Sequence, residues 1–141
     1  MRPRLMHGSI NIENRLIIFG GAAGQGVGSG FYNDVWFYDS VSGYERMVTN
    51  GQYPTPRANF GIARSKHEMI IVGGRLRLSF PEPLMFQTNY NCDVYMLNVT
   101  TSAWQRVVTS GDEPSALHML RCSMISEDEM LTFGGAAIDG K

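Results

Sequence analysis

Three short, mostly apolar runs divide the chain, and each ends at a pair of glycines. The runs are residues 16–19, 69–72 and 130–133, followed by Gly20-Gly21, Gly73-Gly74 and Gly134-Gly135. Runs of this length with β-branched and aromatic members are too short for a helix and are typical of buried strands. The first glycines stand 53 and 61 residues apart (20 to 73 and 73 to 134). A period of about 50 residues indicates a repeat protein such as a propeller or a solenoid.

The same order of short strands surrounds each run. We predict strands at residues 5–12, 16–19, 34–39 and 44–48 in repeat one (residues 3–50), and at 59–64, 68–72, 93–98 and 103–108 in repeat two (54–110). The third repeat (114–141) is incomplete, with strands at 119–125 and 129–133. Short turns such as Glu13-Asn14 join antiparallel neighbours. The pattern therefore predicts an all-β chain of about ten strands with essentially no helix.

Other residues recur at fixed places in the repeats. Arg4 and Arg57 each follow a proline and stand 16 residues before the first glycine, a place that His118 takes in the third repeat. The third strands begin with Asp34-Val35-Trp36 and Asp93-Val94-Tyr95, and Tyr44 matches Trp104 in the fourth strands. Recurrence of this kind fits a structural role, with the arginine stems packed beside the aromatic residues of each sheet.

These residues resemble the kelch repeat family, which combines a Pro-Arg opening, a Gly-Gly doublet, an Asp-Val-aromatic strand and a late tryptophan. The resemblance covers essentially the whole chain. It implies a kelch-type β-propeller fragment of about two and a half four-stranded antiparallel blades, in which the doublet ends the second strand of each blade. Tyr44 in place of tryptophan and His118 in place of arginine depart from the pattern.

Composition narrows the possible partners. Twelve basic and 13 acidic residues give a net charge of −1 without a basic cluster, which makes nucleic acid an unsuitable partner. Neither a membrane-length apolar run nor a signal peptide is found, so we expect a cytoplasmic, intracellular protein. Cys92 and Cys122 lie in strand-like runs, where a buried thiol is favoured over a disulfide.

Candidate chemistry is sparse. Glycines at positions 24, 26, 28 and 30 open a strand rather than a helix, which favours a flexible loop over a nucleotide site. His7, His67 and His118 lack the close spacing of zinc ligands, so we predict neither a metal nor a cofactor. The alternative is a kelch-like propeller enzyme with a metal or small-molecule site at the channel mouth, for which Tyr32, Tyr90, His7 and Cys122 are available ligands.

The long connections favour binding at one end of the sheets. In an antiparallel meander the second-to-third loops and the links between blades share one face. The longest insertion is residues 75–91, which we expect to be a loop whose residues either bind a partner or anchor the loop. The candidate binding residues on this face are Arg75, Arg77, Phe80, Met85, Phe86, Tyr90 and Tyr53.

The predicted function is therefore a non-catalytic module that binds a protein or peptide. The kelch resemblance implies a substrate receptor of a ubiquitin ligase, a scaffold, or a regulatory propeller attached to a phosphatase. Because propellers use at least four blades, we expect this chain to be a piece of a longer one with two uncovered apolar faces. Isolated, it should self-associate, aggregate, or fold only with the rest of its parent.

Overall fold

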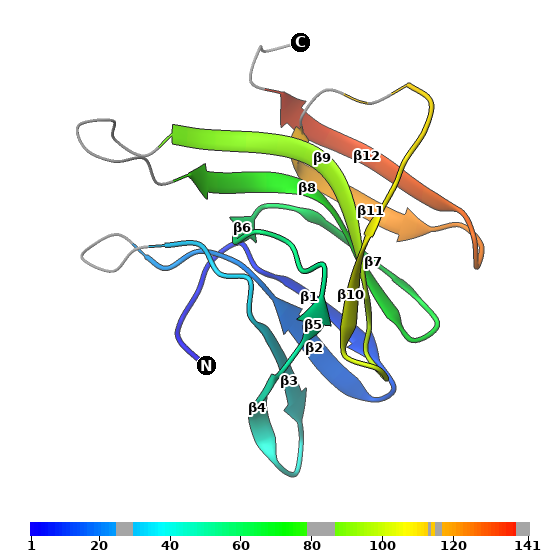
Figure 1. Ribbon diagram of the computed structural model, residues 1–141. Helices are drawn as coiled ribbons and strands as arrows, with labels where there is room; N and C mark the ends of the chain where they lie inside the picture. Colours follow the sequence, from blue (N-terminus) through cyan, green and yellow to red (C-terminus); the bar gives the residue numbers. More distant parts are fainter. Residues whose placement is uncertain (25–29, 79–86, 113, 115–116, 138–141) are drawn as a thin grey trace.

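The computed structural model describes residues 1–24, 30–78, 87–112, 114 and 117–137. Within these ranges the chain forms twelve strands in three sheets and no helix, which confirms the all-β prediction. Accordingly, the described part of the chain contains no helix long and apolar enough to cross a membrane. The sheets follow one another in a curved stack, as expected for part of a kelch propeller (Figure 1).

The first sheet is a meander in the order β1-β2-β3-β4. Its strands are β1 (Gly8–Ile12), β2 (Arg15–Phe19), β3 (Val35–Asp39) and β4 (Gly43–Met47). Glu13 and Asn14 have φ angles of 52° and 63°, the left-handed values of a two-residue turn whose twist suits antiparallel strands. β1 begins later than predicted, because Leu5 instead forms an isolated bridge with Ala22.

The second sheet contains six strands rather than four. The predicted meander is β7 (Gly61–Ser65), β8 (Glu68–Leu78), β9 (Gln87–Asn98) and β10 (Ala103–Val107). The link from the first sheet adds β5 (Asn50–Gly51), which pairs in parallel with β10. It also adds β6 (Arg57–Ala58), which pairs with the far half of β8. The sequence predicted neither strand, because a two-residue strand has no periodicity.

The prediction that residues 75–91 form one long loop is wrong, because part of this segment is β-strand. β8 and β9 continue past the doublet, pairing from Gly74↔Asn91 to Leu78↔Gln87 and forming a two-stranded extension that we call the arm. Gly73 and Gly74 have φ angles of 62° and 107°, and the register shifts between Val72 and Gly74. The glycines therefore form a bulge from which the ladder resumes, so the doublet does not end this strand.

The third sheet corrects the place assigned to His118. Its strands are β11 (Leu117–Met124) and β12 (Met130–Ala137), and β12 also runs through its glycine doublet. In the second sheet Arg57 pairs with Leu76, and the corresponding third-sheet pair is Leu117↔Ala137. The equivalent pairs before the doublets are Gly61↔Val72 and Arg121↔Phe133, which are 11 and 12 residues apart in the sequence. The β11–β12 hairpin therefore holds one extra residue, and counting back from the glycine selects the wrong residue. Leu117, not His118, occupies the place of the arginine.

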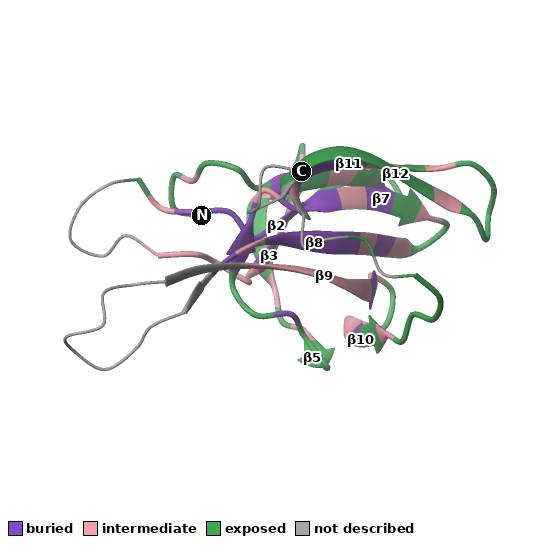
Figure 2. Cartoon of the chain, turned by 90° about the horizontal axis from the view of Figure 1, so that it is seen from above, coloured by how far each residue is buried: buried purple, intermediate pink, exposed green. Residues whose placement is uncertain are grey.

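The apolar core lies between the first and second sheets. Phe19 packs edge-on against Phe60 and Trp104, with ring centroids 5.3 and 5.2 Å apart. The buried cluster comprises Ile12, Ile17, Phe19, Val35, Phe60, Met69, Ile71, Leu97 and Trp104. Figure 2 shows this burial along β2, β7 and β8, whereas β11 and β12 are largely exposed. Because burial of each large side chain stabilises a fold by about 1.5–3 kcal/mol, the packing of sheet on sheet is the main stabilising interaction.

Backbone hydrogen bonds connect the sheets at the start of their inner strands. The Asn59 amide donates to the Met6 carbonyl at 3.1 Å, and the Met119 amide donates to the Asn59 carbonyl at 2.8 Å. All three residues have φ between 57° and 61°. The same left-handed backbone conformation thus recurs at the equivalent residue of each inner strand, and the hydrogen bonds of these residues link consecutive sheets.

Candidate partner-binding surface

The two ends of the sheets differ in the length of their connections. The β1–β2, β3–β4, β7–β8 and β9–β10 turns are short and lie at one end. The opposite end, which we call the loop end, carries the β2–β3 connection (residues 20–24 and 30–34) and the arm (Figure 1). It also carries the second half of the link (residues 48–56), where the Asn33 amide donates to the Pro54 carbonyl. Binding residues concentrate on long connections that a rigid scaffold positions. The loop end is therefore the surface with the greatest capacity to recognise a partner.

Arg57 anchors the connections of the second sheet beneath the loop end. Its guanidinium is completely buried, donating to Asp93 Oδ1 at 2.6 Å and Oδ2 at 3.3 Å and to the Gly73 carbonyl at 3.0 Å. It also donates to the Thr55 carbonyl and hydroxyl, both at 3.1 Å, and lies over the Tyr95 ring. A buried charge is tolerated when it is paired and its donors are satisfied, as they are here. This network ties the doublet to the third strand and to the link.

Arg4 makes the corresponding network in the first sheet. It donates to Asp34 Oδ1 and Oδ2 at 2.6 and 3.0 Å and to the Gly20 carbonyl at 3.0 Å, and lies 4.4 Å from the Tyr32 ring centroid. Asp34 also accepts a 2.6 Å hydrogen bond from the Trp36 indole. Burial alone raises the pKa of the Asp34 carboxyl, but the hydrogen bonds from Arg4 and Trp36 and the Arg4 charge outweigh it, so the pKa is lowered. Asp34 is therefore ionised within this network.

The base of the arm gathers aromatic and polar side chains. Arg75 and Tyr90 face each other across β8 and β9, and the Arg75 guanidinium lies 5.7 Å from the Phe31 ring centroid. The Tyr90 and His118 rings pack with centroids 4.3 Å apart. Asn91 Oδ1 and His118 Nδ1 are buried without a hydrogen-bond partner among the described residues. The cluster joins segments of all three repeats, and two of its buried polar atoms accept or donate no hydrogen bond to protein atoms in the described ranges.

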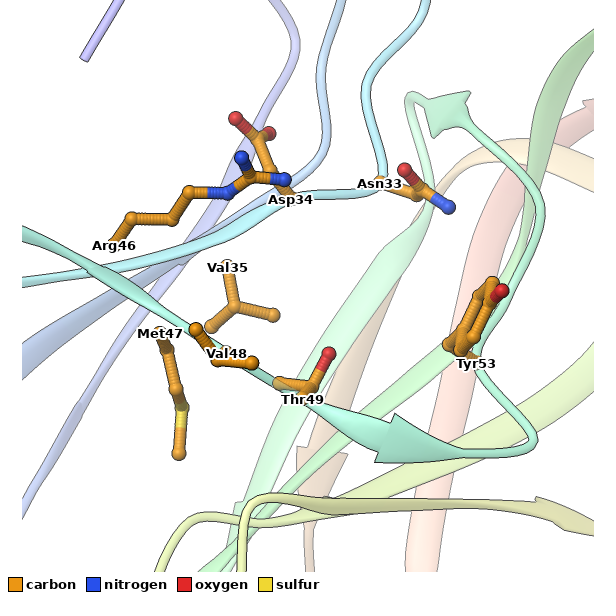
Figure 3. Close-up of a pocket in the computed structure, with 8 residues that line it drawn as sticks. All are labelled: Asn33, Asp34, Val35, Arg46, Met47, Val48, Thr49 and Tyr53. Atoms are coloured by element: carbon orange, nitrogen blue, oxygen red, sulfur yellow. The ribbon is translucent and has the colours of Figure 1, made fainter.

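Two cavities open at equivalent places in the first two sheets, where the third strand begins and the fourth ends. The first is about 480 Å³ and is lined by Asn33, Asp34, Val35, Arg46, Met47, Val48, Thr49 and Tyr53 (Figure 3). The second is about 410 Å³ and is lined by Asn91, Cys92, Asp93, Arg106, Val107, Val108 and Thr109. Each combines a carboxylate, an exposed arginine and a Val-Thr step. Tyr53 lines only the first cavity, which is the larger of the two.

The remaining predicted residues are distributed around this end. Arg77 lies on β8 opposite Thr88. Phe80, Met85 and Phe86 lie outside the described residues. The structure brings Arg75 and Tyr90 together and leaves Tyr53 exposed at the first cavity, on a different connection. Sequence reasoning missed Phe31, Asn91 and His118 at the arm and Arg46 and Arg106 at the cavities. Arg46 and Arg106 each stand two residues after the matched residues Tyr44 and Trp104, and this recurrence is a sequence signal that could have identified the cavities.

The residues considered for a metal site have separate neighbours. Tyr32 lies against Arg4, Tyr90 lies against His118, and His7 is exposed ahead of β1. Burial raises the pKa of the Cys122 thiol to about 11. Within the described part of the chain, no three His, Cys, Asp or Glu side chains are grouped as metal ligands would be.

Comparison with known proteins gives the family. A family model described as the KLHDC2/KLHL20/DRC7 Kelch-repeats domain matches residues 1–135. The Kelch domain-containing protein 10 homolog of Drosophila melanogaster is 29% identical over 80% of this chain and 18% of the relative. Human Kelch domain-containing protein 2 is 26% identical over 99% of this chain and 38% of the relative. Tip elongation aberrant protein 1 of Schizosaccharomyces pombe is 27% identical over 94% of this chain and 11% of the relative. The chain spans less than two fifths of the length of each of these relatives. Because the family model matches nearly the whole chain, the chain belongs to the kelch-repeat family.

Proposed function

We propose that this chain is a non-catalytic protein-interaction module and that its partner contacts the loop end. The observation that carries the proposal is the separation of the connections by length. Short turns lie at one end, and the arm, the β2–β3 connection and the second half of the link lie at the other. Strands extended beyond the sheet and held by a buried arginine network present side chains with little loss of conformational entropy on binding.

The chemistry of the loop end suits a peptide or a folded protein. Arginine and tyrosine are enriched in binding hot spots, and the described surface offers Arg75 and Tyr90 at the arm and Tyr53 beside the first cavity. The cavities are large enough to receive a side chain. An adaptor of a ubiquitin ligase, a scaffold and a regulatory propeller of a phosphatase would each use such a surface.

Partner capture with matched variants tests the proposal. Proteins bound by immobilised wild-type chain are identified by mass spectrometry, and the affinity of each for Tyr53→Ala, Tyr90→Ala and Arg75→Ala is then measured by calorimetry. We expect losses of about 1–4 kcal/mol for the residues that contact the partner. Val41→Ala is the control, because Val41 is almost fully exposed in the β3–β4 turn at the opposite end. A partner that is insensitive to all three substitutions but lost with Val41→Ala would contradict the assignment.

A further inference from the structure

The link between the first two sheets contains an asparagine followed by a glycine, Asn50-Gly51. Asn50 is the one asparagine of the chain that precedes a glycine. This order of residues is chemically reactive, because the backbone nitrogen that follows an asparagine can attack the side-chain carbonyl carbon, and glycine places no side chain in the way of that attack. The equivalent place in the link that follows the second sheet holds Ser110-Gly111, which cannot react in this way.

The pairing of β5 leaves both reacting groups accessible. β5 lies beside β10 at the edge of the second sheet (Figure 2). The Asn50 amide donates to the Ser102 carbonyl and the Gln52 amide to the Trp104 carbonyl, each at 3.0 Å. Because successive amides of a strand point to opposite sides, the Gly51 amide points away from β10, where β5 has no second neighbour among the described strands. The Asn50 side chain is exposed, so the two groups can meet without displacing a packed residue.

We propose that Asn50 is a site of spontaneous deamidation and that the product loosens the link. The Gly51 nitrogen bonds to the Asn50 Cγ, the side-chain amide group leaves as ammonia with the proton of that nitrogen, and a cyclic imide remains. Water then opens the imide. Opening at Cγ gives aspartate, whereas opening at the backbone carbonyl carbon gives isoaspartate, in which the main chain passes through the side-chain carbons and is one methylene longer. Water is the only reactant that the sequence of steps consumes.

The added methylene does not fit the contact between β5 and β10. The two 3.0 Å hydrogen bonds lie on either side of the reacting peptide and fix its length. The contact is also close, because a side chain at Gly51 would come 2.3 Å from the Trp104 carbonyl oxygen. The Gln52 side chain continues the ladder by accepting a 3.3 Å hydrogen bond from the Arg106 amide. A longer main chain cannot keep all of these contacts, so the formation of isoaspartate releases β5 from β10.

Release of β5 reaches the loop end through the next residues of the link. Tyr53 lines the first cavity, and the Pro54 carbonyl accepts a 3.2 Å hydrogen bond from the Asn33 side chain. This consequence rests on the proposed function, in which a partner contacts the loop end. A partner that contacts Tyr53 should therefore bind the isoaspartate form more weakly, whereas a partner that contacts only the arm should bind both forms equally.

Incubation of the whole chain at neutral and at mildly alkaline pH, followed by peptide mapping, tests the modification. The tryptic fragment of residues 47–57 contains Asn50 as its only asparagine. We expect Asn50 to deamidate faster than any other asparagine of the chain, and faster still at the higher pH, because the attacking nitrogen must lose its proton. Labelling with an isoaspartate-specific methyltransferase distinguishes isoaspartate from aspartate in this fragment. Asn50→Ser, which copies Ser110, should abolish the labelling of the fragment.

Urea unfolding of the purified isoaspartate form tests the consequence for the link. Its midpoint should lie about 0.5–1 M below that of the unmodified chain, because one or two hydrogen bonds of β5 are lost. Asn50→Asp, measured when freshly purified, carries the new charge without the added methylene. This variant should unfold at the midpoint of the unmodified chain.

Two results would overturn the inference. An Asn50 that keeps its amide as long as the other asparagines do would show that β5 protects it from attack. An isoaspartate form with an unchanged midpoint would show that the link accommodates the longer main chain. Neither measurement needs a partner, so a failure of the proposed function would leave both readouts intact and would remove only the expected difference in partner binding.

Discussion

Gly51 holds the link between the first two sheets in a position that no other residue can take, and Gly51→Ala should therefore be strongly destabilising. Gly51 has a φ of 83°, and a side chain there would come 2.3 Å from the Trp104 carbonyl oxygen. Relief of that clash must move β5 from β10, which removes the 3.0 Å hydrogen bonds from Asn50 to Ser102 and from Gln52 to Trp104. Left-handed strain and two lost hydrogen bonds together cost about 2–5 kcal/mol.

Gly111 provides a matched control. It lies three residues before Pro114, as Gly51 lies three residues before Pro54, and its φ is 94°. A side chain at Gly111 would meet no atom within 4 Å, so Gly111→Ala bears only the backbone strain of about 1–2 kcal/mol. Comparison of the two variants therefore isolates the packing of the link from the conformational preference of glycine.

Urea unfolding followed by tryptophan fluorescence, at one fixed protein concentration, measures both variants. With an m-value of about 2 kcal/mol/M, Gly51→Ala should lower the midpoint by about 1–2.5 M and Gly111→Ala by about 0.5–1 M. Trp104 reports directly on the β5–β10 contact, because it pairs with Gly51. Equal shifts for the two variants would refute the reasoning, since they would mean that the link contributes nothing beyond the backbone angle.

Three further predictions concern ionisable side chains. Arg57→Lys should lower the free energy of unfolding by about 2–4 kcal/mol, because an ammonium cannot replace the forked contacts of a buried guanidinium, whereas Arg46→Lys on the exposed surface should change it little. The lowered pKa of Asp34 means that its stabilisation is present above the unfolded value of about 3.9 and is lost as pH falls toward the folded value. Unfolding measured from pH 5 to pH 2 should therefore show a smaller loss of stability for Asp34→Asn than for wild type, and parallel curves would contradict this. In a Cys92→Ser background, Cys122 should react with iodoacetamide far more slowly than glutathione does at pH 8, and its rate should increase as the pH rises toward its pKa of about 11. The free energy of unfolding should fall over the same pH range, because the fold favours the neutral thiol.

The strands and their glycine doublets could be predicted from the sequence because they depend on local patterns. Alternation and short apolar runs identify a strand wherever it lies, and the positive φ of Gly20, Gly73 and Gly134 is a property that few other residues allow. Comparison of the repeats also placed Arg4 and Arg57 at equivalent positions without knowledge of their partners. The loop end could be located as well, since alternating strand direction assigns connections to ends.

The candidate site was predictable only in part, because its composition depends on contacts between distant segments. The sequence identified residues 75–91 as an insertion, but the bulge that lets β8 and β9 continue into an arm depends on their pairing. Tyr90 was predictable as an interface residue type, whereas its contact with His118 arises only when the third sheet packs against the second. The extra residue in the β11–β12 turn also changed which residue takes the arginine's place, and only the strand register reveals that change.

The sequence could not decide which of two equivalent apolar positions is buried. Tyr44 and Trp104 hold the same place in their repeats and have similar apolar character, yet Tyr44 is half exposed and Trp104 is buried. The difference comes from the neighbouring sheet, because Phe19 covers Trp104 while none of the described residues covers Tyr44 in the same way. The hydrophobic effect acts on area removed from water, and that area depends on what packs against a residue in space. The repeat pattern therefore determined which positions can form an interface, and the tertiary structure decided which of them do.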